Sequence, residues 1–344
     1  MGASAATPYI GKFVRDQRDA IAPIFNGDIE YFEMPEVPIK KLKYLRFFYN
    51  FLFFVRKKNF SIIHVHFYFP TIIAAFLYQR FINKNCKIFV TFHGSDVFLY
   101  SRRNKMYYHL LKYVDNYIFV SKGLYTGFVD KFGPIKKPVH ILCAGINPLF
   151  FQDSVSFSQK KCYDLIFIGT INENKGADRL HHILMNLPGQ LRVIIVGRGP
   201  REDIFHTDFL GKHEITLAGS LHTKEVIKVL KQSKYLINLS RNESFGMVLS
   251  EAMAVGTPVI ATETDGSVEQ VTHKKNGFLL PQNKLSFNTT GLTITKQALE
   301  IDETHYALMV ENAKRNSQQF SMHRVSHKIA AMYESEIINQ SQIE

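Results

Sequence analysis

Cysteine is scarce in this sequence of 344 residues, which contains only three. Cys86, Cys143 and Cys162 are far apart and odd in number, and none belongs to a Cys-x-x-Cys pair or a group with histidine. Neither a disulfide framework nor a structural zinc site is therefore expected, and a reducing, cytoplasmic setting fits best. Residues 1–7 have no basic start and no apolar core, so no secretory signal is expected there.

Acidic residues are outnumbered, with 30 against 42 basic residues and a net charge of +12. This balance implies attraction to an anionic partner but does not identify it, because nucleic acid and lipid headgroups both qualify. No nucleic-acid recognition motif is present, so nucleic-acid binding rests on charge alone and is not predicted.

An aromatic run, Phe47–Val55, lies within the cation-rich segment 40–58. As a helix, residues 45–55 would span only about 16 Å, against roughly 30 Å for the hydrocarbon core, so this run cannot cross a bilayer. Two interpretations are open. The segment is either an interfacial anchor whose cations contact anionic lipid on the inner face of the cell membrane, or a helix packed on its own domain.

Short apolar runs alternate with longer helical stretches, which predicts βα units and parallel sheets. The pattern occurs twice, on either side of a polar linker at residues 152–161. We predict an α/β fold with a first domain at 1–151, a second at 152–320 and a C-terminal helix at 321–344. Ligands of such sheets bind outside the carboxyl ends of strands, so chemistry is expected in a cleft between the domains. The predicted strands are Ser61–Phe67, Lys87–Phe92, Tyr117–Ser121, Val139–Cys143, Leu165–Gly169, Leu191–Gly197, Ile215–Ala218, Tyr235–Leu239, Val259–Ala261 and Phe278–Leu280.

Two carboxylates, Glu243 and Glu251, bracket the most informative segment. A strand-like run ends just before Glu243, and Gly256 and Pro258 supply stop signals for a short helix over 246–255. At about 1.5 Å rise per residue, the carboxylates lie roughly 12 Å apart, with free helix N-terminal amides between them. That layout suits a nucleotide diphosphate sugar. The helix N-terminus can hold its pyrophosphate, and each carboxylate can bind one hydroxyl-rich ring.

Two further segments carry candidate polar residues. Residues 164–176 form a predicted strand, polar loop and helix start, with Lys175 at the helix N-terminus, where its ammonium and the free amides both favour a diphosphate. His93 and Asp96 follow another buried strand and lie at its carboxyl end. His93 can hydrogen-bond a sugar hydroxyl, and Asp96 can orient His93 or hold up the loop.

Together these segments resemble the sugar-nucleotide site of retaining GT-B glycosyltransferases of family 4. The resemblance implies two Rossmann-like doubly wound domains facing a cleft, and a last helix that returns toward the first domain. The matching stretches are His93–Val97, Ser121–Gly123, Gly145–Asn147, Asp164–Gly176, Gly197–Pro200, Ser240–Thr262, Asp265–Gly266 and Glu269.

The resemblance also implies roles for single residues. Catalysis would involve His93, Lys175 and Glu243, with Glu243 on the donor hexose and Lys175 on the diphosphate. The acceptor side would include His93 and Asp96. Residues expected to contact the donor are Gly11, Thr170, Lys175, Gly197, Glu243, Ser244, Phe245, Gly246, Met247, Val248 and Glu251.

The chain departs from the family pattern at two places. Thr170 stands where an arginine usually helps to grip the diphosphate, which leaves a neutral hydroxyl in place of a permanent charge. Arg241, Lys12 or Arg15 are candidate substitutes. The N-terminus goes directly into a stretch resembling the loop and helix that follow the family's first strand. Either that strand is absent, or the start of the sequence is internal and residues 1–7 are a remnant. His64 and His66, inside an apolar strand, are assigned structural roles.

The predicted activity is transfer of a hexose, with retention of configuration, from a nucleotide diphosphate sugar to a saccharide or lipid-linked acceptor in cell-surface polysaccharide synthesis. A UDP-sugar is the favoured donor. No D-x-D motif occurs, so no metal and no cofactor are expected, and helix amides with Lys175 would hold the charge. The alternative is a catalytically impaired glycosyltransferase-like subunit that docks on the membrane or a partner enzyme, motivated by Thr170 and the short N-terminus.

Overall fold

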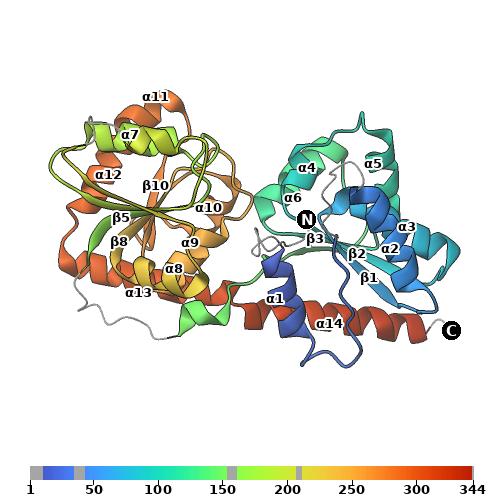
Figure 1. Ribbon diagram of the computed structural model, residues 1–344. Coiled ribbons are helices and arrows are strands. Elements are labelled where there is room, and N and C mark those ends of the chain that lie inside the picture. The colour runs from blue at the N-terminus through green and yellow to red at the C-terminus, as the bar shows by residue number, and fades with distance from the viewer. Residues whose placement is uncertain (1–10, 35–42, 153–160, 207–210, 343–344) are drawn as a thin grey trace. The chain divides into compact units, whose positions relative to one another are not determined.

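The chain forms two units, each built on one parallel sheet (Figure 1). Unit 1 comprises Met1–Gly145 and Met322–Glu344, and unit 2 comprises Ile146–Ser321. The predicted α/β class is confirmed. The computed structural model describes residues 11–34, 43–152, 161–206 and 211–342. The predicted N-terminal segment before Gly11, the pair Lys40-Lys41 and most of the predicted linker therefore lie outside the described residues.

Within the described residues, the sheet of unit 1 has four parallel strands in the order of the sequence. All four coincide with predicted apolar runs. The strand that comes first among the described residues forms one edge of the sheet. The predicted absence of the family's first strand concerns residues outside the described ones and stays a prediction. The strands are β1 (Ile62–His66), β2 (Lys87–Phe92), β3 (Asn116–Phe119) and β4 (Val139–Ile141).

Local sequence sets the ends of the helices in unit 1. Helix α6 (Lys122–Phe132) is an example: Ser121 Oγ accepts a hydrogen bond from the Leu124 amide at 3.1 Å, and Gly133 follows the last turn with a φ of 95°. These are the usual N-cap and C-terminal glycine signals. The other helices are α1 (Lys12–Ile21), α2 (Lys43–Val55), α3 (Tyr68–Phe81), α4 (Ser95–Phe98), α5 (Lys105–Leu110), η2 (Leu111–Tyr113) and α14 (Met322–Ser341).

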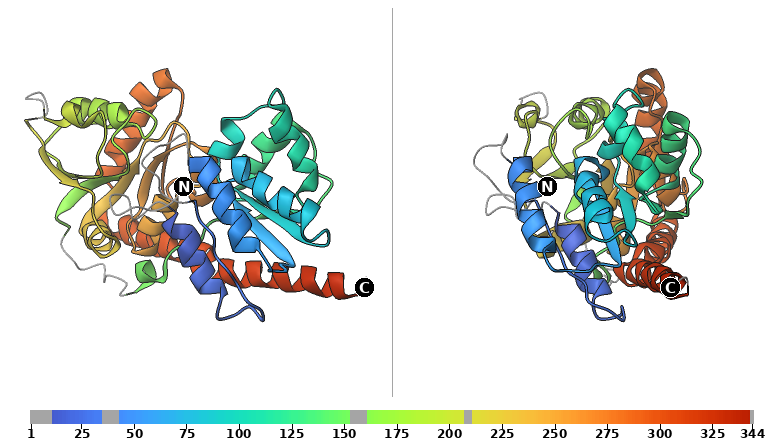
Figure 2. Two further views of the ribbon diagram at one scale, coloured as in Figure 1. Left: turned by 45° about the vertical axis from the view of Figure 1, so that its right-hand side comes forward. Right: turned by 90° about the vertical axis from the view of Figure 1, so that its right-hand side faces the viewer.

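Helix α14 belongs to unit 1 although it comes last in the sequence. It packs against α1, and the two helices lie side by side in Figures 1 and 2. The ring of Tyr333 meets Phe89 of β2 at 5.5 Å, and its hydroxyl lies 2.5 Å from Nδ1 of His64. The C-terminal helix thus completes the core of the first sheet.

Helix α2 divides its aromatic residues between two faces. Phe47 and Phe51 are buried, whereas Tyr49 and Phe53 are 60% and 57% exposed. The helix therefore packs on its own unit, as one interpretation of the sequence proposes, and leaves a second apolar face uncovered. No helix among the described residues is long and apolar enough to span a bilayer.

In the part of unit 2 that the structure describes, the sheet has six parallel strands in the order β10-β9-β8-β5-β6-β7. Each coincides with a predicted run. Because the strands are parallel, the loops after β5, β6, β8 and β9 all leave the sheet at the same edge. The strands are β5 (Tyr163–Ile168), β6 (Arg192–Val196), β7 (Glu214–Gly219), β8 (Ser233–Asn238), β9 (Val259–Thr262) and β10 (Gly277–Leu280).

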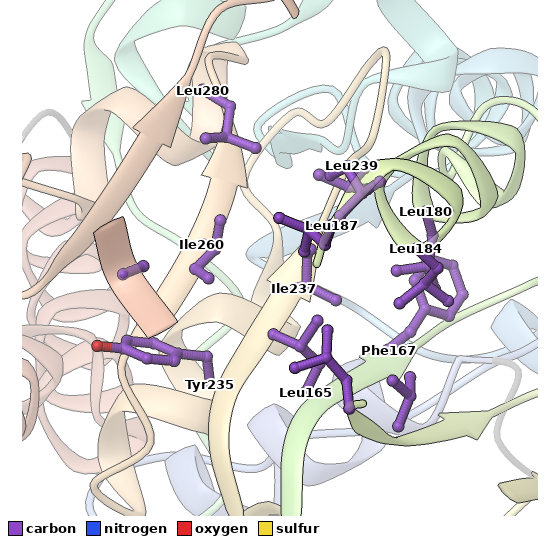
Figure 3. Packing of buried hydrophobic residues seen from close by; sticks show 14 of the residues in the cluster. Leu165, Phe167, Leu180, Leu184, Leu187, Tyr235, Ile237, Leu239, Ile260 and Leu280 are labelled. Carbon is purple, nitrogen blue, oxygen red and sulfur yellow. The ribbon is translucent and has the colours of Figure 1, made fainter. Parts of the chain in front are cut away.

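Helices cover both faces of this sheet, and Figure 3 shows the core on one side of it. Leu165 and Phe167 of β5 pack with Leu180 and Leu184 of α7 and with Ile237 of β8. Burying each such side chain contributes roughly 1.5–3 kcal/mol. The helices are η3 (Pro148–Phe151), α7 (Ala177–Asn186), η4 (Glu202–Phe205), α8 (Thr223–Lys231), α9 (Met247–Ala254), α10 (Asp265–Gln270), α11 (Lys284–Ser286), η6 (Phe287–Gly291), α12 (Leu292–Leu299), α13 (Glu303–Ser317) and η7 (Gln318–Phe320).

Candidate functional site

The loop between β5 and α7 carries Lys175 and is held against the end of β8. Gly176 precedes α7 with a φ of +80°, and a Cβ there would lie 2.2 Å from the carbonyl oxygen of Leu239. Glycine permits both the left-handed backbone and this close approach. Asn172 fixes the loop further, because its Oδ1 accepts a hydrogen bond from the Lys175 amide at 2.8 Å. Lys175 is therefore held next to the N-terminus of α7.

Lys175 forms an ion pair with Glu243 at this edge of the sheet. Its Nζ lies 2.5 Å from Glu243 Oε2, and the two side chains are 30% and 17% exposed. Ser240 Oγ lies 3.3 Å from the same carboxylate oxygen. The contact joins residues that are 68 positions apart, and the sequence does not indicate it. Side chains paired in this way can separate to bind a phosphate and a hydroxyl group respectively.

The segment after Glu243 leads into α9 and is held by α10. Helix α9 (Met247–Ala254) lies within the predicted range 246–255, and Gly256 and Pro258 follow it as the predicted stop signals. Gln270 donates from Nε2 to the Phe245 carbonyl, and the Gly266 amide donates to the Glu243 carbonyl at 3.0 Å. The first amides of a helix have no acceptor inside the helix, so the N-terminus of α9 can bind an anion.

The other predicted donor-site residues of this segment differ in how far their side chains are buried. Phe245 is 6% exposed and its ring meets Phe320 at 5.2 Å, so its side chain anchors the loop. Gly246 directly precedes the helix. Half-buried side chains in this stretch belong to Ser244, Met247, Val248 and Glu251. Glu251 lies in the second turn of α9.

The loops after β5 and β6 interlock through their backbones. A Cβ on Gly197, whose φ is +133°, would lie 2.0 Å from the carbonyl oxygen of Gly169. The Gly169 amide donates to the Val196 carbonyl, and the Ile171 amide donates to the Arg198 carbonyl, each at 3.0 Å. Gly197 thus allows the loop after β6 to pack closely against the loop after β5, which carries Lys175.

Thr170 is exposed in this loop, and Arg241 does not fill its place. The Arg241 guanidinium binds both carboxylate oxygens of Asp178, at 2.9 and 2.6 Å, and also donates to the Glu173 carbonyl. The hydrogen bonds with Asp178 raise the pKa of Arg241. Burial alone would raise the pKa of Asp178, but the bonds and charge of Arg241 outweigh it and lower that pKa. Arg241 is therefore already committed to another partner.

Unit 1 brings together three histidines: His64 in the middle of β1, His66 at its carboxyl end, and His93 directly after β2. His66 Nδ1 lies 3.1 Å from His93 Nε2, and the rings of Phe67 and Phe13 meet the His93 ring at 4.4 and 5.1 Å. His64 Nε2 lies 2.7 Å from the Thr91 hydroxyl. Among the described residues, no group of three or more histidine, cysteine or acidic side chains is arranged to hold a metal ion.

Burial keeps this histidine cluster neutral. It lowers the pKa of His66 to about 4, and burial together with the neighbouring His66 ring lowers the pKa of His93. Two neutral imidazoles share one N–H in their hydrogen bond, so the tautomer of His66 sets that of His93. With Nε2 of His93 facing His66, Nδ1 is the nitrogen available to a ligand.

Asp96 supports the loop that carries His93. Its carboxylate is 3% exposed and accepts hydrogen bonds from the backbone amides of Tyr68, His93 and Gly94 at 3.1, 3.0 and 2.8 Å. Burial raises the pKa of Asp96, and these amide bonds partly offset that effect. Of the two roles open from the sequence, holding the loop agrees with these contacts.

Two family models match the chain. The model for Glycosyltransferase Family 4 matches residues 15–149, and the model for Glycosyl transferases group 1 matches residues 151–315. The chain belongs to the family 4 glycosyltransferases. The family resemblance inferred from the residues is thereby confirmed.

Known proteins similar to this glycosyltransferase include characterised enzymes. It is 26% identical to N-acetyl-alpha-D-glucosaminyl L-malate synthase of Bacillus anthracis, over 81% of this chain and 75% of that protein. Sucrose-phosphate synthase from Thermosynechococcus elongatus superposes with a TM-score of 0.76 at 18% identity, covering 96% of this chain and 94% of that one. HepE from Anabaena, solved in complex with UDP and glucose, gives 0.68 at 18% identity over 88% and 85%. These structures confirm the predicted GT-B fold.

The site of this glycosyltransferase contains one residue whose role the sequence does not suggest. His66 is assigned a structural role because it lies in an apolar strand, yet it contacts His93 directly. A usable signal is that His66 and His93 both end neighbouring predicted parallel strands, whose carboxyl ends meet at one edge of a sheet. Gly11, at the start of α1, belongs to unit 1 with these histidines, whereas Lys175 and Glu243 belong to unit 2.

Proposed function

We propose that this glycosyltransferase moves a hexose from a nucleotide diphosphate sugar to a saccharide or lipid-linked acceptor in cell-surface polysaccharide synthesis. The observation that carries the proposal is the Lys175–Glu243 pair, 2.5 Å apart, beside the N-terminus of α9. One site thus offers a cation, helix amides and a carboxylate. A sugar diphosphate presents the matching groups, namely phosphate oxygens and sugar hydroxyls.

In this proposal the parts of the donor divide among the residues. Lys175 and the amides around Phe245 and Gly246 hold the diphosphate, Glu243 accepts hydrogen bonds from the hexose, and Glu251 accepts them from the ribose. UDP is the favoured nucleotide, which the UDP complexes of HepE support.

The proposed reaction retains configuration at the anomeric carbon and uses no metal ion. The bond from that carbon to the leaving phosphate breaks, and the acceptor oxygen bonds on the same face. The acceptor proton passes to the leaving phosphate. Lys175 and the helix amides stabilise the charge that develops there. His93, through Nδ1, holds a hydroxyl of the transferred sugar or the acceptor.

Nucleotide titrations test the donor site. UDP and UDP-hexoses are expected to raise the melting temperature, because a ligand that binds only the folded chain stabilises it. At a ligand concentration of a hundred times Kd, the free energy of unfolding should rise by about 2.7 kcal/mol. Lys175→Met should abolish the shift with both ligands. Glu243→Gln should weaken UDP-hexose more than UDP, because only the sugar hydroxyls contact it. Lys296→Met, which removes an exposed Lys296–Glu300 pair, is the matched control.

The outcomes separate the candidate functions. If no nucleotide raises the melting temperature of the wild-type chain, the donor site is wrong. If UDP-hexose binds but is neither hydrolysed nor transferred, the proposed activity is wrong. The protein is then the catalytically impaired glycosyltransferase-like subunit that Thr170 suggests.

We also propose that unit 1 docks on an anionic membrane surface at the cytoplasmic side through the uncovered face of α2. That face is apolar, and its flanking cations suit anionic headgroups. Its exposed residues are Tyr44, Leu45, Tyr49, Leu52 and Phe53.

Flotation with phosphatidylglycerol vesicles tests the membrane proposal. The pair Leu45→Ser and Phe53→Ser is expected to lose vesicle binding, while Leu308→Ser, at an exposed leucine of unit 2, keeps it. Equal flotation of both variants would contradict docking through α2.

A further inference from the structure

A pocket of about 650 Å³ lies in unit 2 beside the amino end of β10. It is bounded by residues 273–278, which lead into β10, by the end of α12 and by the first turns of α13. Because the strands are parallel, this pocket lies at the opposite end of the sheet from the loops that carry Lys175 and Glu243. Pockets for small organic ligands enclose about 300–1,000 Å³, so this one has room for such a ligand.

Two lysines at this pocket have no acidic partner. Lys274 and Lys275 are exposed, and neither forms an ion pair with any of the described residues. Lys274 has a left-handed backbone with a φ of 64°, and its amide donates to the Gly277 carbonyl at 2.7 Å. A long side chain is uncommon in that conformation, and such exceptions are concentrated at functional positions.

Two histidines add hydrogen-bonding groups to the same pocket. His273 Nδ1 accepts a hydrogen bond from the Leu279 amide at 3.1 Å, so Nε2 carries the ring proton and can donate to a ligand. Asp302 Oδ1 accepts from the His305 amide at 3.0 Å, and its Oδ2 lies 2.6 Å from His305 Nδ1. The Asp302 carboxylate is therefore already engaged by α13, and the unpaired ammonium groups make the pocket attractive to an anion.

Apolar side chains form another part of the lining. Phe278 and Met309 are buried beneath the pocket, Ile301 is half-buried, and Leu308 is 55% exposed. Carbon atoms of a ligand would remove the exposed parts of Ile301 and Leu308 from water, which favours binding. The pocket thus combines two cations with an apolar surface, and an inorganic anion would use only the cations.

We propose that this pocket binds a small organic phosphate monoester, with its phosphate on Lys274 and Lys275 and its apolar portion on Ile301 and Leu308. A phosphate dianion matches two ammonium groups in charge and accepts the hydrogen bonds that they and His273 donate. A phosphodiester, such as the headgroup of a phospholipid, carries one charge fewer and fits the two cations less well.

A path of hydrogen bonds links the pocket to the proposed donor loop. Asn276 is 3% exposed and donates from Nδ2 to the Gln270 carbonyl at 2.9 Å. Gln270 is 1% exposed and donates from Nε2 to the Phe245 carbonyl. On the other side, Asn312 of α13 donates from Nδ2 to the Lys275 carbonyl at 3.2 Å. The segment that carries the two lysines is thus fixed both to α13 and to the loop before α9.

This path gives the pocket a consequence that rests on the proposed function. A ligand on Lys274 and Lys275 would steady residues 272–276, and with them Gln270 and the Phe245 backbone proposed to hold the diphosphate. The monoester and UDP should then strengthen each other's binding by about fivefold, at the lower end of the usual coupling between two sites. Binding of the monoester itself does not depend on the donor site.

Fluorescence titration tests the pocket, because the chain contains no tryptophan. Leu308→Trp places a reporter in the wall, and phenyl phosphate is the probe. Its Kd should be at least about tenfold lower than those of inorganic phosphate and phenol, each of which lacks one half of the ligand. Methyl phenyl phosphate, a diester, should also bind more weakly than the monoester.

Variants of the lysines supply the matched comparison in the same reporter chain. Lys274→Met with Lys275→Met should raise the Kd for phenyl phosphate at least about tenfold and leave UDP binding in place. Lys224→Met with Lys228→Met removes the same charge from exposed positions of α8 and should change neither. Lys175→Met should lose UDP and keep phenyl phosphate.

The outcomes separate the pocket from the donor site. Equal losses in the two double variants, loss of phenyl phosphate from Lys175→Met, or equal affinities for phenyl phosphate and inorganic phosphate would each overturn the proposal. Calorimetry with UDP at saturating phenyl phosphate measures the coupling, and an unchanged Kd for UDP would refute it. A chain that binds phenyl phosphate but no UDP would instead contradict the proposed function.

Discussion

Replacing Thr170 by arginine should strengthen binding of UDP. The exposed Thr170 lies five positions before Lys175 in the loop proposed to hold the diphosphate, where a permanent cation is missing. A charge-assisted hydrogen bond is worth about 1.5–3 kcal/mol, and about 1.4 kcal/mol corresponds to a tenfold change in affinity. Because the position is exposed, solvent screening reduces the gain, so we expect about a tenfold lower Kd for UDP with Thr170→Arg.

Isothermal titration with UDP at two salt concentrations measures this effect. Thr170→Gln is the matched control, since it adds a long polar side chain without a charge. The gain should shrink at high salt, because salt screens the attraction between the added guanidinium and the diphosphate. Equal affinities for Thr170→Arg and Thr170→Gln would refute a diphosphate site at this loop.

Three further predictions concern the supports of the site. Gly176→Ala should destabilise the protein by about 2 kcal/mol more than Gly189→Ala. Both glycines have a left-handed backbone, but only a Cβ added at position 176 would clash with a carbonyl oxygen. Urea unfolding measures the difference. The free energy of unfolding should keep the full contribution of the neutral His66 above pH 6.5 and fall as the pH drops toward 4, because the unfolded chain binds the proton more tightly. The loss from His66 alone should be on the order of 3 kcal/mol. In urea melts at several pH values, His66→Gln should flatten this dependence. In steady-state assays, His66→Leu should lower kcat about tenfold or more with little change in the KM for the donor. His66→Gln can still form a hydrogen bond with His93 Nε2, so it should recover part of the lost kcat. A rise in KM without a fall in kcat would contradict a positioning role.

The sheets were predictable from sequence, while the contacts across them were not. The strands in the described ranges are short apolar runs bounded by turn residues, and that local signal is enough to place them. The Lys175–Glu243 pair depends instead on β5 and β8 being neighbours, an order that no local pattern encodes. The bond between His66 and His93 likewise follows from the pairing of β1 with β2.

Burial was harder to predict for a helix with one face packed on its unit and an apolar face exposed to solvent. The composition of α2 leaves open whether it packs or lies on a membrane, and the structure buries Phe47 and Phe51 while exposing Tyr49 and Phe53. A cavity of about 240 Å³ in unit 1 was not predictable, because its walls come from six separate segments of the chain. Only the assembled unit shows that they enclose a space.

In the proposed donor site, the pairing of Lys175 with Glu243 would select against simple anions. A free phosphate ion that drew Lys175 away would leave the half-buried Glu243 beside Ser240 without its cation, so the phosphate's attraction to the lysine would be largely cancelled. A molecule that carries phosphate and hydroxyl groups at the right separation would satisfy both side chains at once. The ion pair would then act as a joint requirement, met by a ligand that carries both kinds of group.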